Sequence, residues 1–127
     1  MVAALERARR AARKAQEAMY EGLCAVIEYG EVTDEKTKES YEGEVVTLEG
    51  QPCRLSFEKS GSAVQTEAAA AISQGIKLFL SPEIQIKGNS KIIVTQNGVT
   101  KEYSASGEPA VYSTHQEILL ELFRGWA

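Results

Sequence analysis

The sequence predicts a mainly β protein, a small antiparallel β-barrel or sandwich of about seven strands with an N-terminal α-helix and a long inserted loop. Residues 3–19 are all good helix formers, without glycine, proline or a β-branched residue. After Gly22, short β-prone runs alternate with turn residues about every 8–12 positions, as in barrels and sandwiches. No βαβ spacing and no internal repeat is visible, which argues against a parallel sheet and a solenoid.

The predicted helix has a shallow apolar face. Its apolar side chains recur at spacings of three and four, at Leu5, Ala8, Ala12, Ala15 and Met19. Because alanine buries little area, we expect this helix either to project from the domain or to lie in the groove of a partner. Gly22 is a plausible helix end. We therefore divide the chain into a helical extension, residues 1–21, and a barrel domain, residues 22–127.

The expected strands are 23–32, 44–48, 52–57, 76–80, 92–96, 99–103, 110–112 and 115–123. A polar hairpin loop is expected at 33–43 and a turn at 104–109. Asn97-Gly98 lies between two apolar runs and predicts a type I′ hairpin, because both residues accept a positive φ.

Residues 58–75 interrupt the strand pattern with a run rich in alanine and serine. Residues 66–73 favour two helical turns that Gly75 would end. Loops longer than about 12–15 residues are uncommon in compact domains and are usually functional. We therefore treat the whole loop as a candidate functional segment.

Charge is unevenly distributed along the chain. The net charge is −4, with 14 basic and 18 acidic residues. Residues 1–20 hold five basic and two acidic residues, for +3, and residues 21–127 hold nine and sixteen, for −7. An acidic domain is a poor non-specific DNA clamp. The basic start lacks the features of a signal or transit peptide, and no apolar run is long enough to span a membrane, so we expect synthesis in the cytoplasm.

Motifs for enzymatic chemistry are absent from the sequence. There is no phosphate-binding glycine loop and no nucleophile elbow. His115 is the single histidine, and the carboxylates at 28–35 lack calcium-loop spacing. Cys24 and Cys53 belong to no CxxC motif, so we expect buried, reduced, unreactive thiols. We expect no enzyme, no metal and no cofactor.

Three further features bear on binding: the basic helix, the aromatic residues of the strands and the aromatic residues near the C-terminus. The basic helix carries no aromatic residue, so base stacking on it is not expected. A small barrel that binds single-stranded nucleic acid needs exposed aromatics beside cations; Phe57, Phe79 and Tyr103 lie in strands with few cations nearby. That class stays an alternative. Trp126 and Phe123 are expected to anchor the C-terminal segment, either on the barrel or on a neighbour.

Four runs carry a resemblance to a known family: residues 76–82, 88–95, 106–112 and 115–118. Together they resemble the head–tail connector, or stopper (head completion), proteins of tailed bacteriophages, in particular the XkdH-like proteins of PBSX-type prophages. The resemblance covers about residues 22–126, and the helix at 3–19 lies outside it.

The resemblance implies a structural subunit of a dodecameric ring in the virion neck, assembled in the bacterial cytoplasm. Its partners would be further copies of the chain, an adaptor or portal-side protein and a tail terminator or tail-tube protein, with double-stranded DNA passing through. Stoppers close the channel with a long loop, which corresponds to 58–75 here. The corresponding channel residues would be Ser60, Gly61, Ser62, Gln65, Thr66, Glu67 and Gln74.

Subunit or ring contacts are expected from the basic helix, the first hairpin and the C-terminal segment. The candidate contact residues are Arg7, Arg10, Lys14, Asp34, Lys36, Lys38, Phe123 and Trp126. An acidic channel would repel DNA, because bound cations are what make phosphate adhere. A tail terminator or tail completion protein, on the other side of the same joint, is the alternative of the same class.

Overall fold

A computed structural model describes residues 2–59 and 74–126 and confirms the mainly β fold. One helix precedes six strands. They are α1 (Val2–Glu17), β1 (Gly22–Thr33), β2 (Ser40–Lys59), β3 (Gln74–Leu80), β4 (Lys91–Gln96), β5 (Val99–Val111) and β6 (Gln116–Leu122).

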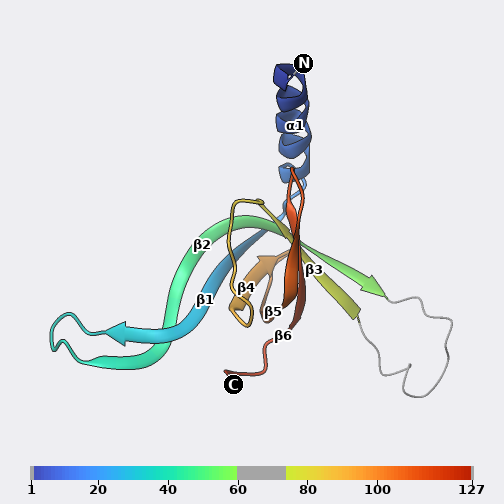
Figure 1. The fold of residues 1–127 in the computed structure, drawn as a ribbon. Coiled ribbons are helices and arrows are strands. Elements are labelled where there is room, and N and C mark those ends of the chain that lie inside the picture. Colours follow the sequence, from blue (N-terminus) through green and yellow to red (C-terminus); the bar gives the residue numbers. More distant parts are fainter. Residues whose placement is uncertain (1, 60–73, 127) are drawn as a thin grey trace.

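The six strands close into an antiparallel barrel in the order β1-β2-β3-β6-β5-β4, with β4 paired back to β1 (Figure 1). Alternate side chains of every strand point inward and form one core. Its largest fully buried members are Leu78, Leu80, Ile92, Ile118, Gln116, Val26, Val94 and Cys53. Closure pairs each strand with two neighbours around the wall, although residues 54–59 of β2 extend past β1 and pair with β3 alone.

The eight expected β-prone runs, interpreted as about seven strands, form six strands, because two expected breaks lie inside longer strands. Residues 104–109 belong to β5, where the pairing register with β6 shifts between Ser106 and Ala110. Gly107 absorbs that shift with a φ of +73°. In the same way, β2 runs unbroken from 40 to 59, with Gly50 at φ +62°. The Asn97-Gly98 hairpin is confirmed, since both residues have positive φ, 53° and 76°.

The first hairpin is longer than the sequence predicts. Residues 33–43 were expected to form a loop, but β1 continues to Thr33 and β2 begins at Ser40, leaving a turn of only 34–39. Paired backbones and a contact between the Thr33 and Ser40 hydroxyls, 3.3 Å apart, extend the ladder. Figure 1 shows this hairpin leaving the barrel wall sideways as a two-stranded projection. We call residues 29–44 the arm.

The helix α1 leaves one end of the barrel and stands clear of it (Figure 1). None of its residues is buried. The helix thus projects from its own domain, and its lying in the groove of a partner stays a prediction. The free thiols of Cys24 and Cys53 lie in the barrel core, as expected. The candidate loop 58–75 is described only at its ends, where residues 58–59 finish β2 and 74–75 begin β3.

Candidate assembly surface

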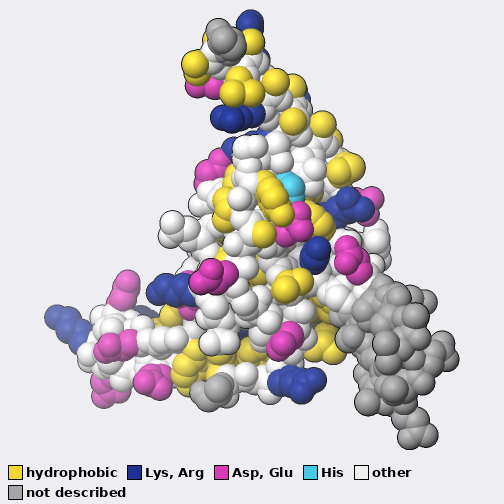
Figure 2. All heavy atoms as spheres, turned by 45° about the vertical axis from the view of Figure 1, so that its right-hand side comes forward, with side chains coloured by type: hydrophobic (Ala, Val, Ile, Leu, Met, Phe, Trp, Pro, Cys, Tyr) yellow, Lys and Arg dark blue, Asp and Glu magenta, His cyan; other side chains and the backbone are white. Residues whose placement is uncertain are grey.

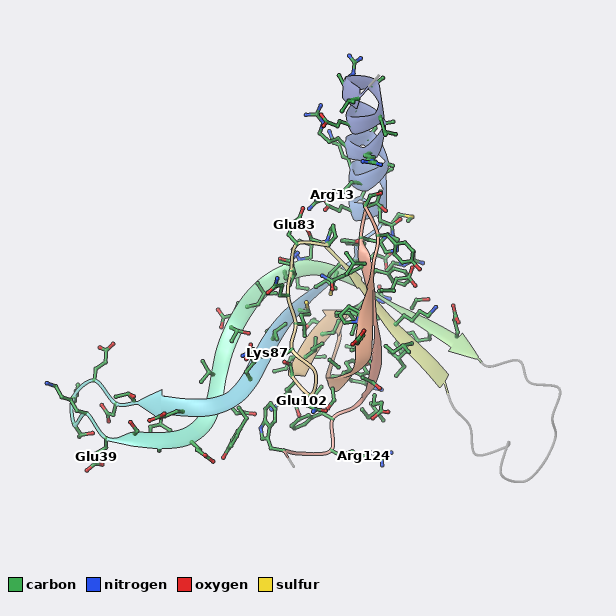
Figure 3. The ribbon with its side chains drawn as sticks, in the orientation of Figure 1. Arg13, Glu39, Glu83, Lys87, Glu102 and Arg124 are labelled. Carbon is green, nitrogen blue, oxygen red and sulfur yellow. The ribbon has the colours of Figure 1, made fainter. Side chains whose placement is uncertain are left out.

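The root of α1 is held to the barrel by one arginine. The guanidinium of Arg13 donates two hydrogen bonds to the Glu83 carboxylate, one of them at 2.6 Å, and one to the Ser81 hydroxyl at 2.6 Å. It also contacts Glu17 one helical turn on, at 3.0 Å. Figure 3 shows Arg13 and Glu83 facing each other at the base of the helix. These bonds lower the pKa of Glu83 to about 2, so the pair stays charged at neutral pH.

The three predicted cations of α1 lie on one side of it. Arg7, Arg10 and Lys14 are all exposed, and their spacing of three and four residues aligns them along the helix. The apolar side chains occupy a different side; in Figure 2, yellow runs along one flank of the helix. The predicted contact residues of the helix are therefore available to a partner.

The tip of the arm is ordered by Asp34. Its side chain accepts the Lys36 backbone N–H at 2.9 Å, and its carbonyl accepts the Lys38 N–H at 2.7 Å. Lys38 takes a positive φ of 57° to complete the turn. The predicted residues Asp34, Lys36 and Lys38 thus lie together, exposed, at the point of the arm farthest from the barrel.

The arm and the residues at its base are strongly acidic. From 28 to 46 the chain holds seven carboxylates against the two lysines of the tip, for a net −5. The carboxylates are Glu28, Glu31, Asp34, Glu35, Glu39, Glu42 and Glu44. Glu31 pairs directly with Glu42 across the two strands. Like charges in that position destabilise a hairpin unless a cation joins them.

The C-terminal segment closes over the base of the arm. Trp126 packs its ring against Tyr29, with centroids 5.3 Å apart, and against Phe123, at 5.1 Å. The indole N–H of Trp126 donates to the Glu44 carboxylate at 3.0 Å. With Lys91, these four residues form what we call the latch. Both predicted aromatic residues thus pack inside their own chain.

Lys91 is the centre of charge in the latch. Its ammonium lies 2.9 Å from Glu44 and 3.0 Å from Glu102, and 4.9 Å from the centre of the Phe123 ring. Its side chain is 11% exposed, so the cation is largely removed from water. The hydrogen bond from Lys91 lowers the pKa of Glu44. In return, the hydrogen bonds to the carboxylates of Glu44 and Glu102 raise the pKa of Lys91.

One end of the barrel is closed by a side chain rather than by a strand. The Gln96 amide accepts the Leu55 N–H at 2.8 Å and donates to the Leu55 carbonyl at 3.3 Å. Beside it lies a small cavity of about 180 Å³, lined partly by Phe57, Val94 and Tyr103. The amide bridges β2 and β4 just beyond Gly22, the residue at which β1 begins.

The aromatic platform of the nucleic-acid alternative does not form. Tyr103 lies in the barrel core, 2% exposed, and Phe79 packs on His115 with ring centres 5.6 Å apart. Of these three rings, only that of Phe57 is well exposed, at 52%. His115 itself is half-buried, stacked on Tyr112 and hydrogen bonded to Glu117 at 2.9 Å.

The predicted channel residues are mostly not described. Ser60, Gly61, Ser62, Gln65, Thr66 and Glu67 lie outside the described residues, as do the helical turns expected at 66–73. Gln74 is the first residue of β3. Within residues 2–59 and 74–126, no group of three or more His, Cys, Asp or Glu side chains is arranged to hold a metal ion.

Sequence reasoning missed the residues that hold the projections in place. Arg13 and Glu83 are 70 positions apart, and Glu44 and Lys91 are 47 apart, so no local spacing links either pair. The one available signal was charge on a mostly apolar strand, at Lys91.

No helix of the described part is long and apolar enough to cross a membrane.

No family model matches the chain, and no curated protein matches it. Among solved structures, the fold is similar to that of protein xkdH of the phage-like element PBSX from Bacillus subtilis. The likeness has a TM-score of 0.45 at 12% identity and covers 79% of this chain and 91% of that one.

Proposed function

We propose that this chain is a non-enzymatic structural subunit of the neck of a tailed phage or phage-like particle. In this role it is a head–tail stopper that joins copies of itself into a ring between the portal side and the tail. Two kinds of support meet here. One is the sequence resemblance carried by the runs at 76–82, 88–95, 106–112 and 115–118. The other is the shape of the subunit.

The observation that carries the proposal is a closed barrel with two unsupported projections. The barrel is closed and has its own core. By contrast, α1 buries no residue, and the arm is a lone two-stranded ribbon. Isolated helices of this length and lone hairpins are marginal in water. Elements of this kind gain stability by packing on neighbours, as subunits of a ring do.

The charge of the subunit suits a channel for DNA. Residues 21–127 carry −7. Cations that neutralise phosphates add affinity and slow the passage of DNA, whereas carboxylates do not hold it. An acidic ring wall would therefore let packaged DNA pass without retention.

The test is electron microscopy of particles made without this gene. We expect DNA-filled or leaking heads separated from complete tails, and restoration of joined particles by the wild-type gene supplied on a plasmid. A variant in which residues 31–42 of the arm are replaced by an Asn-Gly turn between the paired Gly30 and Gly43 should fold, because the barrel core lies elsewhere, and should fail to restore joining. Joined, normal particles without the gene would overturn the proposal. Tails of abnormal length would favour a tail terminator instead.

A further inference from the structure

We propose that α1 of one copy docks, through Arg7, Arg10 and Lys14, on the acidic arm of the next copy. The contact is head-to-tail between identical chains. It rests on the proposed function in one respect: it names the surfaces through which the proposed ring is joined. Its partner is a second copy of this chain, identified by the charges that the two surfaces carry.

Charge complementarity is the first argument. Residues Val2–Glu17 carry five cations and two anions, for +3, and the region 28–46 carries −5. Of the helix cations, Arg13 is engaged with Glu83, whereas Arg7, Arg10 and Lys14 are exposed along one side. The two most strongly charged and least packed parts of the molecule thus have opposite signs.

The arm holds a charge arrangement that a cation would stabilise. Glu31 and Glu42 lie directly opposite each other on adjacent strands, and both are exposed. Directly opposed like charges are unfavourable in a hairpin. Glu44, the next carboxylate toward the barrel on the same face, already has its cation in Lys91. A guanidinium placed over Glu31 and Glu42 would neutralise and stabilise the outer arm, as Lys91 neutralises Glu44 at the base of the arm.

The spacing of the two sets of charges agrees. At about 1.5 Å per residue, Arg7 and Lys14 lie about 10 Å apart along the helix. Glu42 lies two residues into β2 from Ser40, so at about 3.3 Å per residue the Glu31–Glu42 pair lies about 7 Å from the start of the tip turn. The three aligned cations therefore span the distance from the Glu31–Glu42 pair to the carboxylates of the tip.

The helix cannot make this contact within its own chain. Arg13 and Glu83 fix the root of α1 at one end of the barrel, and the latch fixes the base of the arm at its side. Figures 1 and 3 show the helix and the arm, with Glu39 near its tip, leaving the barrel in different directions. A contact between them must join two molecules, and repetition of a head-to-tail contact gives a ring when the rotation closes.

The test is a charge swap on the full chain. One variant reverses the helix, with Arg7→Glu, Arg10→Glu and Lys14→Glu. The other reverses the arm, with Glu31→Lys, Glu39→Lys and Glu42→Lys. The matched control is Glu49→Lys, an exposed carboxylate of β2 outside the arm. Circular dichroism confirms the folding of each protein, and sedimentation velocity at low salt measures self-association.

We expect the wild-type chain and the control to associate as concentration rises. Each reversed variant alone should associate at least about tenfold more weakly, and an equimolar mixture of the two should recover the association. A single chain carrying both reversals should also recover it. Added salt should weaken every one of these contacts, because the charges are exposed.

Two outcomes would overturn the inference: a wild-type chain that stays monomeric at all concentrations, or reversed variants that associate as the wild type does. The microscopy described above keeps the two proposals apart. Separated heads and tails with a failed charge swap would leave the neck role standing and remove this contact. Association recovered by the charge swap, together with normally joined particles in the absence of the gene, would leave this contact standing and remove the neck role.

Discussion

Trp126 donates its indole N–H to the carboxylate of Glu44 at 3.0 Å, across 82 positions of sequence. The same carboxylate accepts a hydrogen bond from Lys91 at 2.9 Å. The base of the arm is therefore tied both to the barrel wall and to the C-terminal segment. The proposed assembly depends on the direction in which the arm leaves the barrel. The Glu44 carboxylate and its two donors, Trp126 and Lys91, hold the arm in that direction.

Replacing Trp126 with alanine should loosen the arm while leaving the barrel folded. The change removes two aromatic contacts, each stabilising by roughly 0.5–1.5 kcal/mol, so we expect a loss of about 1–2 kcal/mol in urea denaturation. Amide hydrogen exchange should speed up at residues 28–31 and 43–46. Trp126→Phe, which keeps a ring but no N–H, should lie between. Tyr112→Ala, away from the arm, is the control, and equal exchange in all three would contradict the latch.

Acid should release the helix root. Arg13 lowers the pKa of Glu83 from 4.5 to about 2. A lowered carboxyl pKa stabilises the folded arrangement above the ordinary pKa, and the contribution is lost as the pH falls from about 4.5 toward 2. Because Glu83 is 60% exposed, screening keeps this contribution below about 1 kcal/mol, so the helix should loosen before the barrel unfolds.

The measurement for the helix root is the distance between spin labels on exposed residues 4 and 85 as the pH falls. The distribution should broaden between pH 4.5 and 2. In Glu83→Gln it should be broad already at neutral pH and change little with acid. A wild-type distribution that stays narrow throughout would show that another contact holds α1.

The side-chain amide of Gln96 should stabilise the fold, and part of that contribution should require its N–H donor to the Leu55 carbonyl. Gln96→Ala leaves the Leu55 N–H and carbonyl without their partner, and we expect a loss of about 1–2 kcal/mol. Gln96→Glu keeps an acceptor but loses the donor while ionised. Its stability relative to wild type should therefore rise as the pH falls and the carboxyl becomes protonated. Gln85→Glu, an exposed change, should show no such trend in thermal unfolding.

The two thiols should be inert in the folded protein. Both are buried, and a hydrogen bond with Cys24 together with burial raises the pKa of the Cys53 thiol. Because the thiolate is the reactive form, a thiol reagent should label wild type only after denaturation. An added exposed cysteine, Ser113→Cys, should react at once in the native state. Rapid labelling of native wild type would contradict the described core.

What the sequence predicted correctly depended on local chemistry. Asn97-Gly98 needs positive φ at both positions, so its turn could be read from two residues. The helix follows from composition, and the buried thiols follow from their apolar neighbours. The contact role of Arg7, Arg10, Lys14, Asp34, Lys36 and Lys38 stays a prediction; they were selected because charge on an unpacked element is visible in sequence, and all six are exposed.

What the sequence did not show depends on long-range pairing. Strand β2 spans 20 residues because residues 40–53 pair with β1, in the arm and in the barrel wall, and residues 53–59 pair with β3. The polar residues at 40–44 lower the apparent strand propensity, but cross-strand hydrogen bonding outweighs it. Likewise, the bonds from Lys91 to Glu44 and from Arg13 to Glu83 exist only once the barrel has closed.

We propose that this chain forms a ring in the neck of a phage particle. The most direct measurement is a cryo-electron microscopy reconstruction of the head–tail joint in particles that encode it. We predict a ring whose subunits fit the six-stranded barrel, with each α1 reaching the arm of the neighbouring copy. A head–tail joint in which no subunit density fits this barrel would contradict the proposed neck role.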